Sequence, residues 1–575
     1  MSRKAVKRRA RKMKLGAILA FAVILVVLVI VLIQKYSPGK EKADLNKYFN
    51  ISQETDCGVV WQGMKSDTVG KIYEGKVYVE YEFLKTYINP IFYFDYNENV
   101  LFYTLPTNLV SVNVGSKDYF VGNNKSSEEY TILKTDAQTA YIALDFVQKY
   151  TNLEYEKFDN PNRVMITSEW GETSMAQVKK NDAVRRLAGI KSEILTQASK
   201  NDKVWVLGDE GAWKKVRTKD GFVGYIPNGS ISKAKNETLS RDFDEPEYTS
   251  IKKSGTINLV WNQVMSKSAN SGFLSSIAST KGVTTLAPTW FTISDNNGNI
   301  SSNASADYVN YAHQLNMEVW ATVNDVDGAG NINEILNFTS KRQKLVNQLI
   351  SEAIKNNIDG INVDLEYVNA KNADGFIQFI REMSIKCHNN GIVLSVDNYP
   401  PASFNLYYNR KQQAKFADYI VVMAYDEHNK NSKEAGSVAS VGYVKEAVEK
   451  TLQDVPAEKL IMGMPFYTRI WKEIPNENPA EGEPPYTLEV ASLSMKEAKQ
   501  RVEVNGATTE WKEDCGQYYA EFKNGGYTYK IWLEEDKSIE EKLKIMKEYN
   551  LAGCGSWKLG LEFDSIWDVI LKYVN

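Results

Sequence analysis

From Ile257 to the C-terminus, short apolar segments alternate with amphipathic stretches of helical periodicity. Apolar runs of four to eight residues, separated by amphipathic helices, are typical of strands in a parallel sheet that is buried on both faces. The predicted strands are 257–261, 284–287, 318–323, 360–366, 393–396, 419–424, 460–464 and 553–557. Eight such βα repeats predict an α/β fold, a (β/α)8 TIM barrel over 255–575. The long interval at about 466–537 is predicted to be an α+β insertion.

One predicted helix leads directly into the fourth of these strands. Its apolar residues recur at helical spacing from Leu345 onward. Thr339 or Ser340 is expected to cap its N-terminus, and the pair Asn356-Asn357 is expected to end it.

Upstream of the barrel, apolar and polar residues alternate singly, which is the period of half-buried strands. Residues 57–168 contain several such runs, broken by Asn, Gly and Pro, and are predicted to form a small α+β domain. Residues 182–235 are predicted to form a small all-β barrel, in which Trp213–Arg217 and Asp220–Ile226 pair across an Asp-Gly turn. The polar segment 236–254 is expected to be the linker to the large barrel.

The N-terminal end has the pattern of a membrane anchor. Residues 1–14 carry eight basic side chains and no acid, and residues 15–33 are 19 consecutive residues without a charge. A helix of that length spans roughly 28 Å, close to the hydrocarbon core of a bilayer. The positive-inside rule then predicts a single-pass helix in the cell membrane with a cytoplasmic tail, a polar spacer at 34–56 and an exported body. The alternatives are a cleaved signal peptide, which would have a shorter apolar run and a small-residue cleavage site, and a buried core helix.

The composition further limits the partners and the kinds of catalytic site that the chain can have. The chain has 69 Lys and Arg against 72 Asp and Glu, a net charge of −3 that becomes −11 without the basic tail. An acidic body argues against nucleic acid as a partner. With three histidines and four well-separated cysteines, the sequence offers neither a structural zinc site nor an H-E-x-x-H metalloprotease motif. We expect no metal and no cofactor, and the sequence has neither a Walker A nor a G-x-S-x-G motif.

The fourth predicted strand carries three polar residues at alternate positions. Asn362, Asp364 and Glu366 share one face of the strand, whereas Ile361 and Val363 share the other. In a barrel the apolar set faces the helices, so the polar set points inward and toward the C-terminal rim, where barrel active sites lie. Buried polar groups are costly unless they pair with one another or meet a substrate. The triplet is therefore predicted to be the active site, and the alternative is a set of satisfied polar groups in the core.

The octet from Asp359 to Glu366 resembles the D-G-x-D-x-D-x-E signature of glycoside hydrolase family 18. That family includes chitinases, endo-β-N-acetylglucosaminidases and bacterial cell-wall glycosidases. Further segments resemble strands of the family in the same order along the chain, namely 286–291, 423–426, 463–467 and 551–557. The resemblance spans about 255–575 and implies a retaining glycosidase that needs no cofactor.

The resemblance also implies roles for individual residues. Family 18 uses the 2-acetamido group of the substrate as the nucleophile, so a second enzymic nucleophile is not required. Glu366 is then the general acid and base, Asp364 orients the acetamido group, and Tyr425 hydrogen-bonds its oxygen. Trp557 is expected to be the floor on which the sugar stacks. The other implied substrate-binding residues are Asn362, Asp426, Trp290 and Tyr467, of which the last is equally consistent with the core of the insertion.

Asn362 departs from the family pattern, which has an inner Asp at that position. An amide cannot share a proton with Asp364, but it can donate a hydrogen bond that keeps the carboxylate charged. The same N-x-D-x-E form occurs in the branch that resembles spore-cortex and cell-wall N-acetylglucosaminidases. We therefore interpret Asn362 as a marker of that branch.

The two upstream modules resemble other known domains. Residues 75–83, followed by Phe94–Asn97, are similar to α+β modules related to the copper amine oxidase N-terminal domain, and no metal site is implied because 57–168 contains no histidine. The W-x-K-V-R-T-x-D-G-x-x-G-Y-I pattern that begins at Trp213 resembles bacterial SH3-like domains, which often dock cell-wall peptides. The alternative is a plain spacer barrel whose aromatic residues form its core.

Together these patterns predict a membrane-anchored extracellular glycosidase that cleaves β-1,4-linked N-acetylglucosamine-containing glycan, with peptidoglycan as the expected substrate. An alternative of a different class, motivated by Asn362, is a scaffold that binds cell-wall glycan without turnover. A chitinase, acting on chitin-like oligosaccharide, or an endo-β-N-acetylglucosaminidase is the third possibility.

Overall fold

The computed structural model of the chain describes all residues except 1–2, 327, 477–478, 480–483 and 575. The chain divides into two compact units. The first comprises Met1–Phe92, Val112–Tyr119 and Ser126–Glu245, and the second comprises Tyr93–Ser111, Phe120–Lys125 and Pro246–Asn575.

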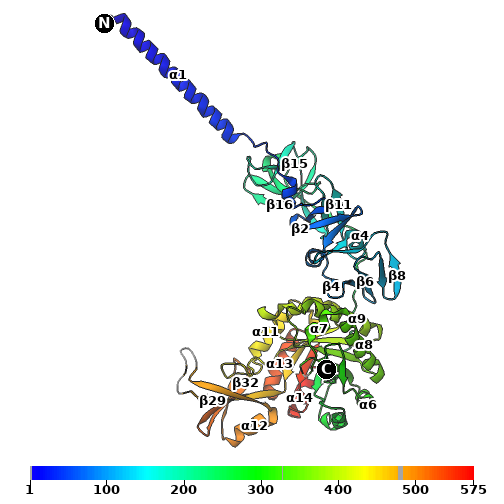
Figure 1. Cartoon of the computed structure of the whole chain (residues 1–575). Helices are drawn as coiled ribbons and strands as arrows, with labels where there is room; N and C mark the ends of the chain where they lie inside the picture. The colour runs from blue at the N-terminus through cyan, green and yellow to red at the C-terminus, as the bar shows by residue number, and fades with distance from the viewer. Residues whose placement is uncertain (1–2, 327, 477–478, 480–483, 575) are drawn as a thin grey trace. The chain divides into compact units, whose positions relative to one another are not determined.

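In the part of the chain that the structure describes, the second unit is built around a closed barrel of eight parallel strands (Figure 1). The strands are β20 (Ile257–Asn262), β21 (Thr285–Pro288), β24 (Glu318–Asn324), β25 (Gly360–Asp364), β26 (Val393–Asn398), β27 (Tyr419–Met423), β28 (Leu460–Pro465) and β34 (Gly553–Trp557). Parallel pairings link them in that order, and β34 pairs back to β20. Each predicted barrel strand is present, so the prediction of an α/β fold with a (β/α)8 barrel is confirmed.

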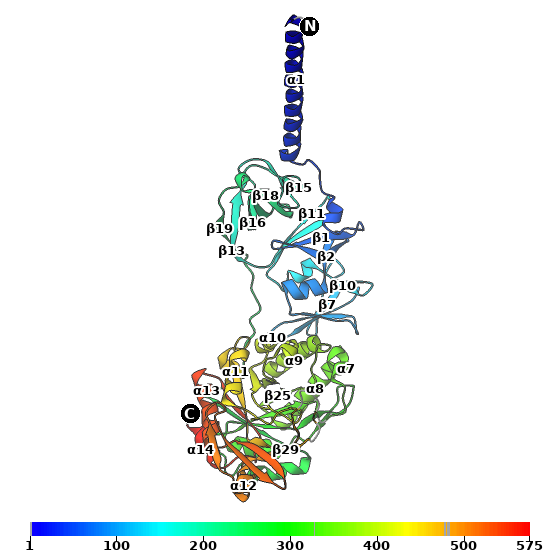
Figure 2. The ribbon, with the colours of Figure 1, turned by 90° about the vertical axis from the view of Figure 1, so that its left-hand side faces the viewer.

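Amphipathic helices surround the barrel strands (Figure 2). The helices of this layer are α5 (Phe273–Ser276), α6 (Ala306–Gln314), α7 (Ile332–Asn337), α8 (Thr339–Asn356), α9 (Ala373–Asn389), α10 (Arg410–Phe416), α11 (Val441–Thr451), α13 (Asp536–Glu548) and α14 (Ser565–Leu571). In α9, for example, Phe376, Phe379 and Met383 recur at helical spacing and are fully buried. Burial of such stripes against the strands supplies most of the stability of the helices.

Helix α8 ends as predicted but begins differently. Asn357 adopts a left-handed conformation (φ 56°) that terminates the helix after Asn356. The prediction that Thr339 or Ser340 caps the helix is wrong, because both are helical and their N–H groups donate hydrogen bonds. The acceptors are Asp95 Oδ2 (2.7 Å) and Glu98 Oε2 (2.9 Å), which the sequence of the helix itself does not reveal.

The lower part of the barrel is filled by aromatic and aliphatic side chains. Trp320 on β24 and Tyr419 on β27 stack with their ring centroids 5.4 Å apart, although their strands are not neighbours. Trp261 on β20 packs into the same fully buried cluster. The barrel is therefore a packed core whose open end is the C-terminal rim of the strands.

The interval between β28 and β34 forms the predicted α+β insertion. Its sheet has the order β30-β29-β33-β32-β31, in which neighbouring strands are antiparallel. Its elements are β29 (Tyr467–Pro475), β30 (Tyr486–Ser494), α12 (Met495–Val504), β31 (Thr509–Lys512), β32 (Gln517–Asn524) and β33 (Tyr527–Leu533). Trp471 is fully buried, as expected for a residue of the insertion's core rather than of a sugar groove.

The first unit consists mainly of small β-sheets. One sheet has the order β11-β12-β1-β2-β3-β10-β9, from β1 (Asp56–Trp61), β2 (Met64–Tyr73), β3 (Lys76–Glu80), β9 (Leu133–Asp136), β10 (Thr139–Ala143), β11 (Glu154–Phe158) and β12 (Arg163–Thr167). A further sheet is formed by β4 (Phe92–Asp95), β5 (Val100–Thr104), β6 (Leu109–Asn113), β7 (Asp118–Val121) and β8 (Asn124–Ser127), with most of β4–β6 in the second unit. Short helices α2 (Leu45–Tyr48), α3 (Tyr81–Phe83) and α4 (Leu144–Val147) complete the α+β character of this region.

The SH3-like region forms its own sheet, in the order β15-β14-β18-β17-β16-β13-β19. Its strands are β13 (Gly171–Gln177), β14 (Asp182–Arg185), β15 (Ile194–Ala198), β16 (Lys203–Glu210), β17 (Trp213–Arg217), β18 (Val223–Pro227) and β19 (Lys235–Leu239). Strands β17 and β18 are antiparallel, and Gly221 in their turn has a φ of 80°, as the Asp-Gly pair predicts. The sheet reaches beyond 182–235 on both sides, because β13 and β19 pair with each other.

Helix α1 (Arg3–Tyr36) contains the uncharged N-terminal segment. Its most apolar stretch has a mean hydropathy of 3.4, and none of that stretch is buried inside the protein. By length and composition the helix is able to cross a membrane.

Candidate active site

The C-terminal rim of the barrel carries the predicted polar triplet. Strand β25 ends at Asp364, two residues earlier than predicted, so Glu366 lies on the loop that follows. Asp325, directly after β24, accepts hydrogen bonds from the backbone N–H groups of Glu366 (2.8 Å) and Tyr367 (3.1 Å). Asp325 is buried, and burial raises the pKa of its carboxyl. The two hydrogen bonds hold the loop that carries Glu366 against the neighbouring strand.

The Glu366 side chain is partly exposed at this rim. The hydroxyl of Tyr399, directly after β26, donates a hydrogen bond to its Oε2. Burial and the adjacent Glu366 raise the pKa of Tyr399, so the phenol keeps its proton and remains a donor. A carboxyl with access to solvent and a positioned donor is suited to general acid–base chemistry.

Asp364 lies on the inner face of the same segment. Its Oδ1 is buried and has no hydrogen-bond partner among the described residues. Burial, and then the nearby carboxylates of Asp397 and Glu366, raises the pKa of Asp364 well above its usual range. Burial and Asp364 also raise the pKa of Tyr425, which lies two residues after the end of β27. These surroundings therefore favour the protonated form of Asp364.

Asn362 is fully buried beneath these carboxyls, and its amide is used inside the barrel. Its Oδ1 accepts hydrogen bonds from Trp261 Nε1 (3.1 Å) and Thr322 Oγ1 (3.0 Å). Its Nδ2 donates to Ser395 Oγ (3.0 Å) and Asp397 Oδ1 (2.7 Å). Asn362 thus connects four strands of the barrel below the active-site rim.

This arrangement changes two expectations for Asn362. Its amide donates to Asp397, where the sequence predicts a hydrogen bond to Asp364. Its exposed fraction is 0%, so it presents no surface to a sugar, although the sequence predicts substrate binding. We assign Asn362 to positioning of the strands and their carboxyls.

The residues after β27 connect the rim to the insertion. Asp426 has a φ of 60°, in the left-handed region that Asp tolerates better than most residues. It accepts hydrogen bonds from the Tyr467 hydroxyl and from Arg469 Nη2 (2.6 Å), both on β29. The rings of Tyr425 and Tyr467 meet edge to face, with centroids 6.4 Å apart. The start of the insertion therefore closes this side of the site and holds Asp426.

The two predicted tryptophans lie in different environments. Trp557, the last residue of β34, is partly exposed, and its ring centroid lies 6.0 Å from that of Trp261. Trp290 is only 1% exposed; its Nε1 donates to Asn270 Oδ1 (3.0 Å) and its ring packs edge-on against Tyr308. Trp557 therefore retains a face for stacking, whereas Trp290, expected to bind substrate, belongs to the core.

A groove of about 820 Å³ opens beside these residues. Tyr399, Tyr425, Asp426 and Arg469 line it, together with residues of the loops after β26 and β27 and of helix α11. Its other lining residues are Pro400, Pro401, Ala402, Phe404, Asn405, Asn429, Lys430, Asn431, Tyr443, Glu446, Ala447 and Lys450. Its size falls within the range of small-molecule and oligosaccharide sites.

Asp325, Asp397 and Tyr399 are site residues that our reading of the sequence missed. Part of the signal is present, because Ser395 and Asp397 flank the apolar Val396 as Asn362 and Asp364 flank Val363, but the polar Asn398 interrupts the pattern before Tyr399. The predicted strand 393–396 ends before that alternation becomes visible, whereas β26 continues to Asn398.

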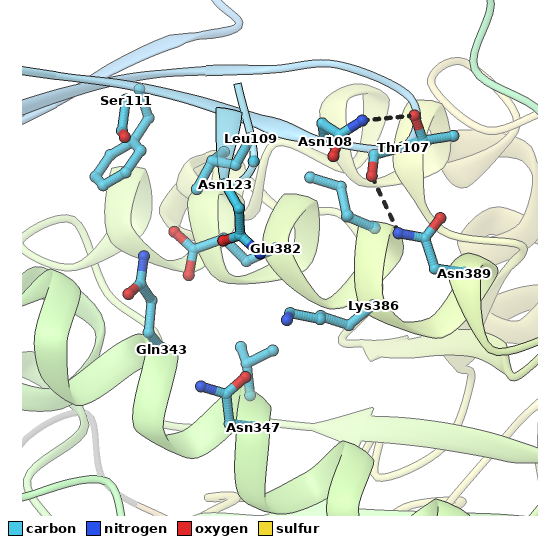
Figure 3. Close-up of a pocket in the computed structure, with 14 residues that line it drawn as sticks. Thr107, Asn108, Leu109, Ser111, Asn123, Gln343, Asn347, Glu382, Lys386 and Asn389 are labelled. Carbon is cyan, nitrogen blue, oxygen red and sulfur yellow. Dashed lines mark hydrogen bonds between the residues drawn. The ribbon is translucent and has the colours of Figure 1, made fainter. Parts of the chain in front are cut away.

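A second hollow, of about 400 Å³, lies on the outer face of the barrel within the second unit (Figure 3). Amide side chains line it, and Asn389 of α9 donates a hydrogen bond to the carbonyl oxygen of Thr107 (3.0 Å). The buried carboxylate at its wall, Glu382, accepts hydrogen bonds from Arg342 Nε (3.0 Å) and Gln378 Nε2 (3.2 Å). This carboxylate is neutralised by the neighbouring Arg342, whereas the charged groups that act on Asp364 at the rim are other carboxylates.

Family comparisons agree with the fold and the motif. The family model described as glycosyl hydrolases family 18 matches residues 260–562. The model described as bacterial SH3 domain matches residues 180–232, which confirms the predicted SH3-like module.

Individual relatives are similar to the barrel part of the chain. The uncharacterized glycosylase YvbX of Bacillus subtilis is 26% identical over 291 residues, which are 48% of this chain and 81% of that protein. The cortical fragment-lytic enzyme of Bacillus subtilis is 25% identical over 251 residues, 42% of this chain and 56% of that protein, so the match spans little more than half its length. A crystal structure of a C-terminal domain from Desulfitobacterium hafniense DCB-2 covers 56% of this chain and 100% of its own, with 21% identity and a TM-score of 0.50. At that identity the last comparison shows a shared fold.

Proposed function

The chain belongs to glycosyl hydrolases family 18 and is a glycosidase, and we propose that it cleaves β-1,4-linked N-acetylglucosamine-containing glycan with retention of configuration. We assign Glu366 as the general acid and base. The observation that carries this assignment is the position of its carboxyl at the rim, partly exposed and hydrogen-bonded to Tyr399, which lines the groove. A carboxyl in that position can reach a glycosidic oxygen bound in the groove.

The reaction we propose has two steps. In the first, the Glu366 carboxyl donates its proton to the glycosidic oxygen, the carbonyl oxygen of the substrate's acetamido group attacks the anomeric carbon, and the bond to the leaving sugar breaks. In the second, the Glu366 carboxylate takes a proton from water, and the hydroxide equivalent opens the oxazolinium intermediate. Two displacements at the same carbon give net retention.

Asp364 and Tyr425 are proposed to stabilise the intermediate. Burial and nearby carboxylates raise the pKa of Asp364, and the positive charge of the oxazolinium would favour its ionised form. Tyr425 keeps its proton because burial raises its pKa, so it can donate to the acetamido oxygen. Trp557 has a free ring face for the sugar, and Asp426, held by Arg469, is positioned to accept from a sugar hydroxyl.

Peptidoglycan is the substrate that we propose. One relative is named a cortical fragment-lytic enzyme, and an SH3-like module suited to wall peptides precedes the barrel. Helix α1 and the basic residues before the apolar run support a single-pass membrane anchor with a cytoplasmic N-terminus and an external barrel.

The test is a panel of substrates offered to the full chain in detergent: peptidoglycan, chitin oligomers and a high-mannose glycan. Product masses report which bond is cleaved, and reducing ends report the rate. We expect release from peptidoglycan; release from chitin oligomers or from the high-mannose glycan alone would instead identify a chitinase or an endo-β-N-acetylglucosaminidase.

A scaffold that binds glycan without turnover is the second candidate, and the amide at position 362 favours it. Binding of peptidoglycan without released products between pH 4 and 8 would support the scaffold. We favour the enzyme because Glu366 is partly exposed and hydrogen-bonded to Tyr399 beside the groove, an arrangement that binding without turnover does not require.

A further inference from the structure

Asp397 is a buried carboxyl that the proposed reaction does not use. It is the penultimate residue of β26 and is 3% exposed. Its Oδ1 accepts the hydrogen bond from Asn362 Nδ2 at 2.7 Å. Its Oδ2 is buried and, among the residues described, has no hydrogen-bond partner. An oxygen in this state is costly unless it carries or receives a proton.

Strand register places Asp397 beside Asp364. Asn362 pairs with Ser395 and Val363 pairs with Val396, so Asp364 and Asp397 follow as the next pair of parallel neighbours. Side chains at paired positions of parallel strands project from the same face, about 4.8 Å apart. Both therefore point into the barrel, and each has one buried oxygen for which no partner is described.

We propose that Asp397 is a positioning residue of the glycosidase: it shares one proton with Asp364 and so supplies, from the neighbouring strand, the inner carboxyl that Asn362 lacks. The inference rests on the proposed function, because the role of Asp397 is to set the charge of Asp364 when the intermediate forms. Asn362 becomes the link that orients Asp397 rather than a lost catalytic position.

The titratable groups that face this pair are also acids. They are Asp325 after β24, Glu366 after β25, Tyr399 after β26 and Tyr425 after β27. Burial, and then the nearby Glu366 carboxylate, raises the pKa of Asp397 to about 8, against the lowering effect of the Asn362 amide and the Trp261 indole. Two adjacent carboxyls in such surroundings do not both ionise readily, so one proton and one negative charge belong to the pair.

The proton stays within the pair throughout the reaction. When the acetamido group attacks and the oxazolinium becomes positive, Asp364 carries the negative charge and Asp397 holds the proton. When water opens the intermediate, the positive charge disappears and the proton can return toward Asp364. The proton that enters the leaving sugar comes from Glu366, so no further donor or acceptor is required.

Replacement of Asp397 by Asn is the first test. For Asp397→Asn we expect kcat on peptidoglycan to fall about 10²-fold while KM changes little, because ground-state contacts with the sugar are untouched. Asp397 raises the pKa of Asp364, so the pH at which kcat is half-maximal should be lower in Asp397→Asn, because that pH reports ionisation of the pair.

A matched control is a buried aspartate at the other end of the neighbouring strand. Asp418, 1% exposed, precedes β27 and accepts hydrogen bonds from His388 and from the backbone N–H of Leu394. Asp418→Asn is expected to lower Tm but to leave kcat and its pH profile unchanged. A drop in kcat that merely follows lost stability would occur in both variants.

Relocation of the carboxyl provides a rescue test. In the double variant Asn362→Asp/Asp397→Asn, the acid and the amide exchange strands and the hydrogen bond between them can form in the opposite sense. We expect kcat of the double variant to be at least tenfold higher than that of Asp397→Asn. A folded double variant without recovery would overturn the inference.

A readout independent of activity is the pH dependence of Tm. Both folded-state pKa values lie above those of the unfolded chain, so the folded state holds more protons and its stability falls as pH rises from about 4 to 8. This fall should be smaller in Asp397→Asn than in the wild-type chain.

The outcomes separate the inference from the proposed function. If Glu366→Gln loses activity while Asp397→Asn keeps kcat and its pH profile, the inference is wrong and the proposed function stands. If the wild-type chain cleaves none of the glycans, the proposed function fails. The Tm comparison alone then decides whether the two carboxyls share a proton. If Tm falls equally with pH in Asp397→Asn and in the wild-type chain, the shared proton is rejected.

Discussion

Buried carboxyl groups lie at two places in the second unit, at the hollow on the outer face of the barrel and at the barrel rim, and the groups around those carboxyls differ. On the outer face, Glu382 (labelled in Figure 3) accepts hydrogen bonds from Arg342 and Gln378, so a permanent cation balances its charge. At the barrel rim, the charged groups that act on Asp364 are other carboxylates, foremost Asp397. A carboxylate neutralised by its own protein stabilises the fold, whereas carboxyls that raise one another's pKa are poised to respond to charge on a substrate. Mutation at the outer face should therefore lower the free energy of unfolding, whereas mutation at the rim should lower kcat.

The largest effect is expected for Glu366→Gln. The amide cannot donate a proton to the leaving oxygen or take one from water, so release of reducing ends should fall about 10³-fold or more. Binding of glycan and Tm should change little, because the side chain is partly exposed and keeps its shape.

A suitable control for Glu366→Gln is Glu548→Gln on α13. The Glu548 side chain is 55% exposed and pairs with Lys445 on the surface. This variant should retain wild-type release of reducing ends. If Glu366→Gln digests glycan as fast as the wild-type chain, Glu366 is not the acid.

The next effect is one of stability, at the outer hollow. Arg342 is fully buried; although burial acts to lower its pKa, Glu382 and other anions raise it. Arg342→Met leaves the Glu382 carboxylate buried without its cation, so the free energy of unfolding should fall by about 3 kcal/mol. Denaturant titration measures this loss, and kcat of the folded protein should stay unchanged.

The double variant Arg342→Met/Glu382→Leu sharpens that comparison. Removal of both charges removes the unpaired carboxylate, so most of the lost stability should return. If the double variant is no more stable than Arg342→Met, or if either variant loses kcat while folded, the outer carboxylate is not purely structural.

The sequence predicts the barrel and Glu366 because both depend on local patterns. Apolar runs mark the strands, and alternation on 360–366 marks the polar face. Helix α8 shows the limit of such patterns: its first N–H groups bond to Asp95 and Glu98, which lie more than 240 residues away in sequence. No local feature of the helix indicates that acceptors for its N-terminal N–H groups come from a segment so distant in sequence.

Site residues were missed or misplaced for a related reason. Trp290 lies in a segment that resembles the family, but its burial against Tyr308 depends on packing between elements. Asp397 becomes significant only through its hydrogen bond to Asn362 on the neighbouring strand. The sequence indicates which strand carries polar residues, whereas the register between strands decides which of them meet.

Tyr399→Phe should have an intermediate effect on the rim. The variant removes the hydroxyl that donates to Glu366 Oε2 while it keeps the ring at the wall of the groove. Loss of a positioned donor to the catalytic carboxylate should lower kcat about tenfold. Steady-state kinetics with peptidoglycan measure this, and Tyr407→Phe on the neighbouring short helix is the control. Equal kcat in the two variants would remove Tyr399 from the site.

The smallest effect is expected at the distant cap of α8, which belongs to the same structural class as the outer ion pair. Asp95 is 1% exposed and accepts hydrogen bonds from the N–H and the hydroxyl of Thr339. Asp95→Asn removes a negative charge from the helix N-terminus, so the free energy of unfolding should fall by about 1 kcal/mol. Asp67→Asn, at a side chain that is 98% exposed, is the matched control and should change stability much less.

The same variant also tests whether the cap affects catalysis. Helix α8 leads into the strand that carries Asp364, and we expect kcat of folded Asp95→Asn to be unchanged. A loss of kcat without a loss of stability would mean that the outer carboxylates also set the geometry of the rim, and the distinction between the two regions would fail.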